Sequence, residues 1–149
     1  MSKSDTWESD LLKLVFNNTT ASLVGDATGL VGSTGVGSLF VSLHTADPGE
    51  TGTQTTSEAT YTGYARVAVA RTTGGWTISG TAPTQAANAA QVSFPQCTGG
   101  SNTVTFIGVG TSVSGTGKLL YSGALTSSLA ISNNITPSFA IGALVVTED

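Results

Sequence analysis

The clearest pattern of hydrophobic and polar positions in the chain is an alternation with a period of two, which is typical of a strand with one buried face. It is strongest over residues 39–44 and returns over residues 64–71. Between them, Asp47, Pro48 and Gly49 have the chemistry of a tight turn. The residues that follow the turn are mostly Thr, Ser and Gln, which offer little to bury. The pattern therefore predicts a strand, a long exposed excursion and a second strand.

Shorter segments with the same signal continue to the C-terminus. We expect further strands at residues 76–79, 91–94, 103–109, 118–125, 129–131 and 138–146. Residues 80–90 are small and suit a connection that crosses between two sheets. Short strands separated by turns rich in glycine and serine are typical of antiparallel sandwiches and barrels. The sequence predicts an all-β protein, an antiparallel β-sandwich of jelly-roll type with about eight strands.

A second pattern, with a period near 3.6 residues, predicts one short N-terminal helix over residues 4–16. Its apolar face consists of Trp7, Leu11, Leu14 and Val15. Ser4 is suited to cap the start of this helix, and the pair Asn17-Asn18 is suited to end it. The helix either covers an open end of the sandwich or docks on a neighbouring subunit, and the sequence leaves both alternatives open.

After the helix, residues 19–37 mix short apolar pairs with glycines, and we expect an extended, partly ordered connection, called here the arm. The chain of 149 residues has the length of one domain. We therefore expect a single β-sandwich domain over residues 1–149, in which residues 1–37 form the helix and the glycine-rich arm.

Charge and hydropathy exclude two classes of partner. Only 9% of the residues are charged, and five basic residues face nine acidic ones, giving a net charge of −4. Because nucleic-acid binding needs a basic stripe that neutralises several phosphates, we expect no nucleic-acid partner. No apolar run is long enough for a membrane span, and the acidic N-terminus is unlike a signal peptide, so we expect no membrane partner and synthesis in the cytoplasm.

Residues with catalytic or metal-binding chemistry are few. His44 is the single histidine and Cys97 the single cysteine, so the chain cannot assemble a zinc site from such ligands. Asp47 and Glu50 lie near His44 but lack the dense spacing of a dedicated calcium loop. A polysaccharide hydrolase would need a pair of carboxylates, for which Asp47 with Glu50 or Glu58 is the only candidate. We expect no catalytic residue, no cofactor, no metal and no enzymatic activity.

An ordered series of phrases resembles one family of proteins. The phrases are LHTADPGETGTQTTSEATYTGYARVAVAR, GGWTISG, VSFPQCTGG and SNNITPSFAIGALVVTED, and they extend from about Leu39 to the C-terminus. They resemble virion structural proteins of tailed bacteriophages that are described as capsid decoration (cement) proteins or as tail-fibre-like proteins. The resemblance implies a β-sandwich or jelly-roll protein that oligomerises on a phage particle, and it carries no catalytic residues.

From this resemblance we expect a cement protein that binds the major capsid protein on the capsid exterior and stabilises the head. The alternative is a tail-fibre, tail-tip or baseplate component that contacts the host surface. We expect self-association, with a homodimer as the first choice by base rate and a trimer as the second. The candidate partner contacts are Trp7, Leu11, Asp47, Pro48, Glu50, Tyr61 and Tyr64.

Overall fold

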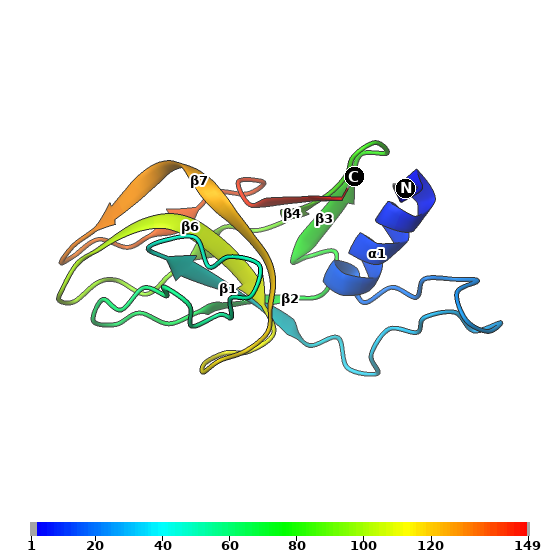
Figure 1. Cartoon of the computed structure of the whole chain (residues 1–149), viewed down its shortest axis with the longest axis horizontal. Helices are drawn as coiled ribbons and strands as arrows, with labels where there is room; N and C mark the ends of the chain where they lie inside the picture. Colours follow the sequence, from blue (N-terminus) through cyan, green and yellow to red (C-terminus); the bar gives the residue numbers. More distant parts are fainter. Residues whose placement is uncertain (1–2, 149) are drawn as a thin grey trace. The chain divides into compact units, whose positions relative to one another are not determined.

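The computed structural model describes residues 3–148 and shows a mostly β protein with antiparallel sheets and one short N-terminal helix (Figure 1). This confirms the predicted fold class, and the jelly-roll arrangement is compatible with it. The elements are α1 (Asp5–Asn17), β1 (Ser38–His44), β2 (Val67–Ala70), β3 (Trp76–Ser79), β4 (Thr84–Asn88), β5 (Val92–Ser93), β6 (Asn102–Gly110), β7 (Leu119–Ile131), β8 (Ser138–Phe139) and β9 (Val145–Glu148). The strands form three sheets, in the orders β2-β1-β6-β7, β3-β4-β9 and β5-β8.

The chain divides into two compact units, each built from segments that are distant in sequence. The helix unit comprises the described parts of Met1–Ser38, Val69–Gln91 and Phe139–Asp149. The sheet unit comprises Leu39–Ala68 and Val92–Ser138. A single domain over residues 1–149 stays a prediction.

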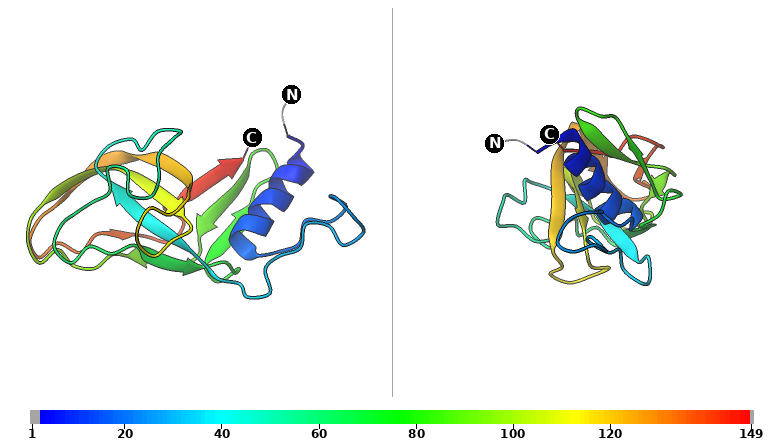
Figure 2. Two further views of the ribbon diagram at one scale, coloured as in Figure 1. Left: turned by 60° about the horizontal axis from the view of Figure 1, so that its bottom comes forward. Right: turned by 90° about the vertical axis from the view of Figure 1, so that its right-hand side faces the viewer.

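In the helix unit, α1 packs against the sheet β3-β4-β9, and both views of Figure 2 show it beside β3. The predicted caps are confirmed. The Ser4 hydroxyl accepts a hydrogen bond from the Trp7 N–H at 3.4 Å, and Asn18 ends the helix in the left-handed conformation with φ 54°. The structure therefore places the helix on a sheet of its own chain.

The predicted buried face of α1 is wrong. Trp7, Leu11, Leu14 and Val15 are only half-buried, whereas the buried residues are Glu8, Leu12 and Phe16. Phe16 packs edge-on against Trp76, with ring centroids 4.8 Å apart. The side of α1 that carries Leu12 and Phe16 therefore faces the sheet, where the Phe16 and Trp76 rings bury apolar area against each other.

The segment predicted as a connection at residues 80–90 contains β4, the central strand of this sheet. Its burial alternates with the period of a strand, although its sequence, TQAAN, has weak strand propensity. Asn88 is buried at its end, where the amide donates to the Ala90 and Ala140 carbonyls at 2.8 Å and accepts from the Leu144 N–H at 2.9 Å. Packing beneath α1 and between two strands thus overrides the local preference.

In the sheet unit, β6 lies between β1 and β7, and Val41 of β1 is opposite Val109 of β6. The two strands predicted at 118–125 and 129–131 are a single strand of 13 residues, β7. A register shift opposite Val104 and Phe106 absorbs the polar residues between them. Conversely, the strand predicted at 138–146 is divided into β8 and β9.

Candidate functional site

The polar segment over residues 45–66 is folded onto the sheet unit, which corrects the expectation of an exposed excursion. Gln54 is fully buried at its centre. Its amide nitrogen donates to the Phe40 carbonyl at 3.3 Å, and its amide oxygen accepts from the Ser112 N–H at 2.9 Å. A β-carbon at Gly110 would overlap the Gln54 side chain, so the glycine makes room for it. Polar side chains can be buried here because their hydrogen-bonding groups find partners.

A buried ion pair joins this segment to the loop that precedes β7. Arg66 is 7% exposed and binds Glu58 through two bonds, from Nε at 2.6 Å and from one terminal nitrogen at 2.7 Å. The same guanidinium donates to the carbonyls of Ser112 at 2.9 Å and Gly115 at 2.7 Å. The hydrogen bond to Glu58 raises the pKa of Arg66. One side chain therefore holds two loops that are far apart in sequence.

Two tyrosines of the segment are engaged in the same region. The Tyr64 hydroxyl donates to Glu58 at 2.9 Å and accepts from the Leu43 N–H at 3.1 Å, and burial raises the pKa of Tyr64. The Tyr61 hydroxyl donates to the Pro95 carbonyl at 3.0 Å, and burial raises the pKa of Tyr61 to about 12. Both hydroxyls thus act as structural hydrogen-bonding groups.

His44 is fully buried at the end of β1. Its Nδ1 lies 2.8 Å from the Thr56 carbonyl, which can only accept, so Nδ1 carries the proton. Its Nε2 lies 2.8 Å from the Ser42 hydroxyl, which donates to the neutral ring. Burial lowers the pKa of His44, against the opposing effects of the Thr56 carbonyl and of Glu58. Neither Asp47 nor Glu50 is a partner of the ring, and Ser42, also fully buried, is not presented to a substrate.

The lowered pKa of His44 predicts a pH-dependent stability. Between the depressed pKa of the folded state and about 6.5 in the unfolded chain, the unfolded state binds more protons, so the free energy of unfolding falls as the pH falls through this window. Because His44 is the single histidine, urea unfolding from pH 8 to pH 5 should isolate its effect. The variant His44→Gln should lose most of this slope, and an unchanged slope would contradict the assignment.

The predicted contact residues lie in different surroundings. Asp47 and Glu50 are exposed, Trp7, Leu11 and Tyr64 are half-buried, and Pro48 and Tyr61 are buried. The turn itself forms as predicted, since the Asp47 carboxylate accepts from the Gly49 N–H at 2.9 Å. Of these residues only Asp47 and Glu50 are exposed, and their contact with a partner stays a prediction.

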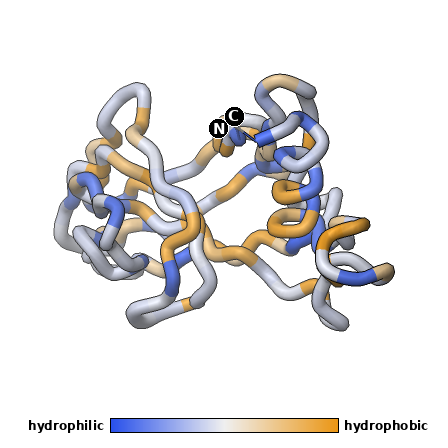
Figure 3. The backbone as a smooth tube through the Cα atoms, turned by 45° about the vertical axis from the view of Figure 1, so that its right-hand side comes forward, coloured by the Kyte–Doolittle hydropathy of each residue, from blue (hydrophilic) through white to orange (hydrophobic). Residues whose placement is uncertain are grey.

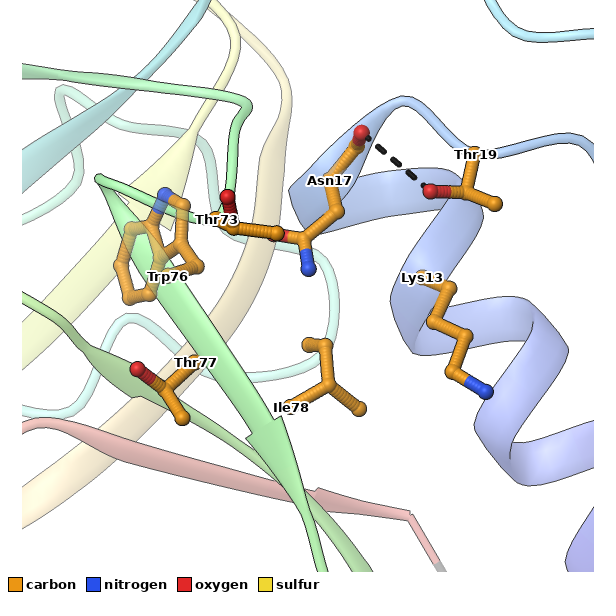
Figure 4. Close-up of a pocket in the computed structure, with 7 residues that line it drawn as sticks. All are labelled: Lys13, Asn17, Thr19, Thr73, Trp76, Thr77 and Ile78. Atoms are coloured by element: carbon orange, nitrogen blue, oxygen red, sulfur yellow. Dashed lines mark hydrogen bonds between the residues drawn. The ribbon is translucent and has the colours of Figure 1, made fainter.

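The helix unit carries an open groove of 640 Å³ between α1 and β3 (Figure 4). Its lining residues are Lys13, Asn17, Thr19, Thr73, Trp76, Thr77 and Ile78. Ile78 and the stem of Lys13 face the groove from opposite sides (Figure 4), and no ion pair of Lys13 occurs within residues 3–148. The groove thus combines an apolar wall with one positive charge.

The arm has more internal contacts than the partly ordered connection that the sequence predicted. Its two sides meet where Ala21 and Leu30 exchange backbone hydrogen bonds of 3.0 and 2.8 Å. The Asn18 side chain binds the Ser33 backbone twice: its amide oxygen accepts from the Ser33 N–H at 2.7 Å, and its amide nitrogen donates to the Ser33 carbonyl at 2.8 Å. The apolar pairs within the glycine-rich arm were the available signal, because unstructured connections seldom carry large aliphatic residues.

Arg71 ties the arm and the helix together. Its guanidinium donates to the Leu14 and Val15 carbonyls at 2.6 Å, two of the last carbonyls of α1, which lack partners within the helix. It also contacts Ser33 of the arm at 3.3 Å. The last turn of α1 has no basic residue of its own, so Arg71 supplies the positive charge that favours this end of the helix dipole.

Replacing Arg71 with alanine should lower the free energy of unfolding by about 2 kcal/mol, because hydrogen bonds from a charged donor to helix carbonyls are lost. Arg71→Lys should keep part of this stability, since lysine retains the charge but not the planar fork. Helix content and thermal unfolding followed by circular dichroism would check both variants. Equal stability of Arg71→Ala and the wild type would show that water can hydrogen-bond the last carbonyls of the helix as well as Arg71 does.

Within residues 3–148, no group of three or more His, Cys, Asp or Glu side chains is placed to hold a metal ion. In the same residues, no helix has the length and apolarity needed to cross a membrane.

A family model described as podophage GP4 fiber I protein gp80 matches residues 2–147, which is nearly the whole chain. A search of curated proteins finds no significant match.

Proposed function

The chain belongs to the family of the podophage GP4 fiber I protein gp80 and is therefore a phage virion structural protein, and on this premise we propose that it is a non-enzymatic component of a virion fibre. The observation that carries the proposal is the match of a fibre-protein family over residues 2–147. This favours the tail-side alternative over the capsid decoration role expected from the sequence.

The chemistry of the described residues supports a structural role. The groups with catalytic potential in the sheet unit are used internally: Arg66 with Glu58, and His44 with Ser42 and Thr56. Such contacts hold loops in place and leave exposed Asp47 and Glu50 without a histidine beside them. The sheet unit is thus suited to present a fixed loop surface.

Capsid decoration is the second candidate, with the major capsid protein as its partner on the capsid exterior. The observation that favours it is the low share of charged residues, 9%. A surface with few charges can be buried over a large area with little desolvation of ions, which suits close packing on a protein lattice.

One experiment separates the two candidates. Particles of the parent phage are dissociated, heads and tail structures are separated, and the chain is quantified in each fraction by mass spectrometry. Recovery with the tail structures in low copy number is expected for a fibre. Recovery with the heads, in numbers comparable to the major capsid protein, would overturn the fibre proposal and establish the decoration role.

The non-enzymatic part of the proposal has its own test. The double variant Asp47→Asn with Glu50→Gln removes the two exposed carboxylates that follow His44 in the sequence. Phage carrying it should degrade host surface polysaccharide as the wild type does. Loss of that degradation with normal particle assembly would contradict a purely structural role.

A further inference from the structure

Exposed aliphatic side chains are concentrated on the arm. Four of the eight large aliphatic side chains that are at least 40% exposed within the described residues lie on it: Leu23 at 90%, Val31 at 65%, Val36 at 47% and Leu30 at 40%. Figure 3 shows apolar stretches on this segment, separated by a hydrophilic one. Single exposed aliphatic residues are ordinary, but four within one short projection form a surface suited to a partner.

Leu23 is the most informative of them. Its φ is 63°, in the left-handed region that a leucine adopts only with strain. The strained backbone presents a side chain that is 90% exposed, so within its own chain Leu23 gains neither a relaxed backbone nor burial. A contact with another molecule would bury the Leu23 side chain, and this would explain why the strained backbone holds it in solvent.

Hydrogen bonds fix the conformation of the arm. The Ala21–Leu30 pair closes it, and Asn18 and Arg71 fix Ser33 near its base. At the tip, Asp26 accepts hydrogen bonds from the N–H and hydroxyl of Thr28, which lower the pKa of Asp26. The arm therefore presents one negative charge beside an apolar side chain.

The groove beside α1 has the complementary features. It offers Ile78 on its wall and Lys13 at its edge. The arm offers Leu23 and Asp26, which match Ile78 in apolar character and Lys13 in opposite charge. Both surfaces occur on every copy of the chain, so a second copy can supply the arm that fills the groove.

We propose that the arm of one copy docks in the groove of the next, with Leu23 against Ile78 and the Asp26 carboxylate paired with the Lys13 ammonium. The contact joins two different surfaces, so it is heterologous and builds a closed ring, or an open chain if the rotation does not close. This goes beyond the proposed function, because the contact is defined by this chain alone.

The test measures self-association of the full-length purified chain by sedimentation velocity over the micromolar to millimolar range. The wild type should associate reversibly. Leu23→Ser should weaken association by at least about tenfold, which corresponds to losing the burial of one aliphatic side chain. Val113→Ser is the matched control, since Val113 is 63% exposed in the sheet unit and lies outside both surfaces.

A charge exchange tests the pairing itself. Lys13→Glu and Asp26→Lys should each weaken association by about three- to tenfold, and the double variant should recover most of that loss. Both positions are exposed, and circular dichroism would verify that the variants fold. A wild type that stays monomeric, or single variants that weaken association without rescue in the double variant, would overturn the proposal. These outcomes are independent of whether the chain is found in the head or tail fraction.

Discussion

Replacing Trp76 with alanine is expected to lower the free energy of unfolding of the helix unit by about 3–5 kcal/mol. Trp76 is fully buried at the start of β3 and contacts Phe16 edge-on at 4.8 Å. Alanine would remove the largest fully buried side chain and the partner that orients α1. The cavity left between helix and sheet adds to the lost apolar burial.

Trp76→Phe is the matched control for this variant. Within the described residues the Trp76 indole N–H has no hydrogen-bond partner, so phenylalanine loses volume but no hydrogen bond. We expect a loss of less than half that of alanine. Urea unfolding followed by circular dichroism would compare the three proteins. If phenylalanine and alanine are equally destabilising, the ring contact with Phe16 is not what stabilises the unit.

Replacing Arg66 with alanine is expected to lower the free energy of unfolding of the sheet unit by about 3–5 kcal/mol, because Glu58 would keep a buried charge without its partner. The Arg66 side chain is 2% exposed and that of Glu58 is 15% exposed, so water can solvate the unpaired Glu58 carboxylate only weakly. The variant also leaves the Ser112 and Gly115 carbonyls without their donor. The loop before β7 should become susceptible to proteolysis.

Two further variants separate charge from geometry in this ion pair. Arg66→Met combined with Glu58→Leu removes both charges and should be less destabilising than Arg66→Ala alone. Lys118→Ala, at an exposed cation, should change stability by less than about 0.5 kcal/mol. Chemical unfolding and limited proteolysis would check these expectations. A double variant as unstable as Arg66→Ala would contradict the uncompensated charge as the cause.

The 47–50 turn and the arm differ in how far the sequence could predict them. Asp47 and Glu50 are exposed beside a turn whose chemistry is local. Leu23, by contrast, was part of an expected extended connection, because its backbone conformation depends on the closure of the arm by Ala21 and Leu30. Pairing between residues nine positions apart in a glycine-rich stretch has no local signature.

By itself, the sequence determined the features that depend on neighbouring residues. Helix α1 begins after Ser4 and ends before Asn18 because of hydrogen bonds and a backbone conformation that involve only residues nearby in the sequence. The alternation over 39–44 predicted β1. It also determined the mostly β fold class, since period-two segments separated by turns recur along the chain.

Only the tertiary structure decided which polar groups are buried together and which face of a helix is covered. Arg66 meets Ser112 and Gly115 across 46 and 49 residues, and β4 becomes a strand because α1, β3 and β9 surround it. The physical reason is that a buried polar group or a weak strand former is stable only when distant partners complete its hydrogen bonds and packing. That completion is a property of the folded chain and leaves no pattern in the local sequence.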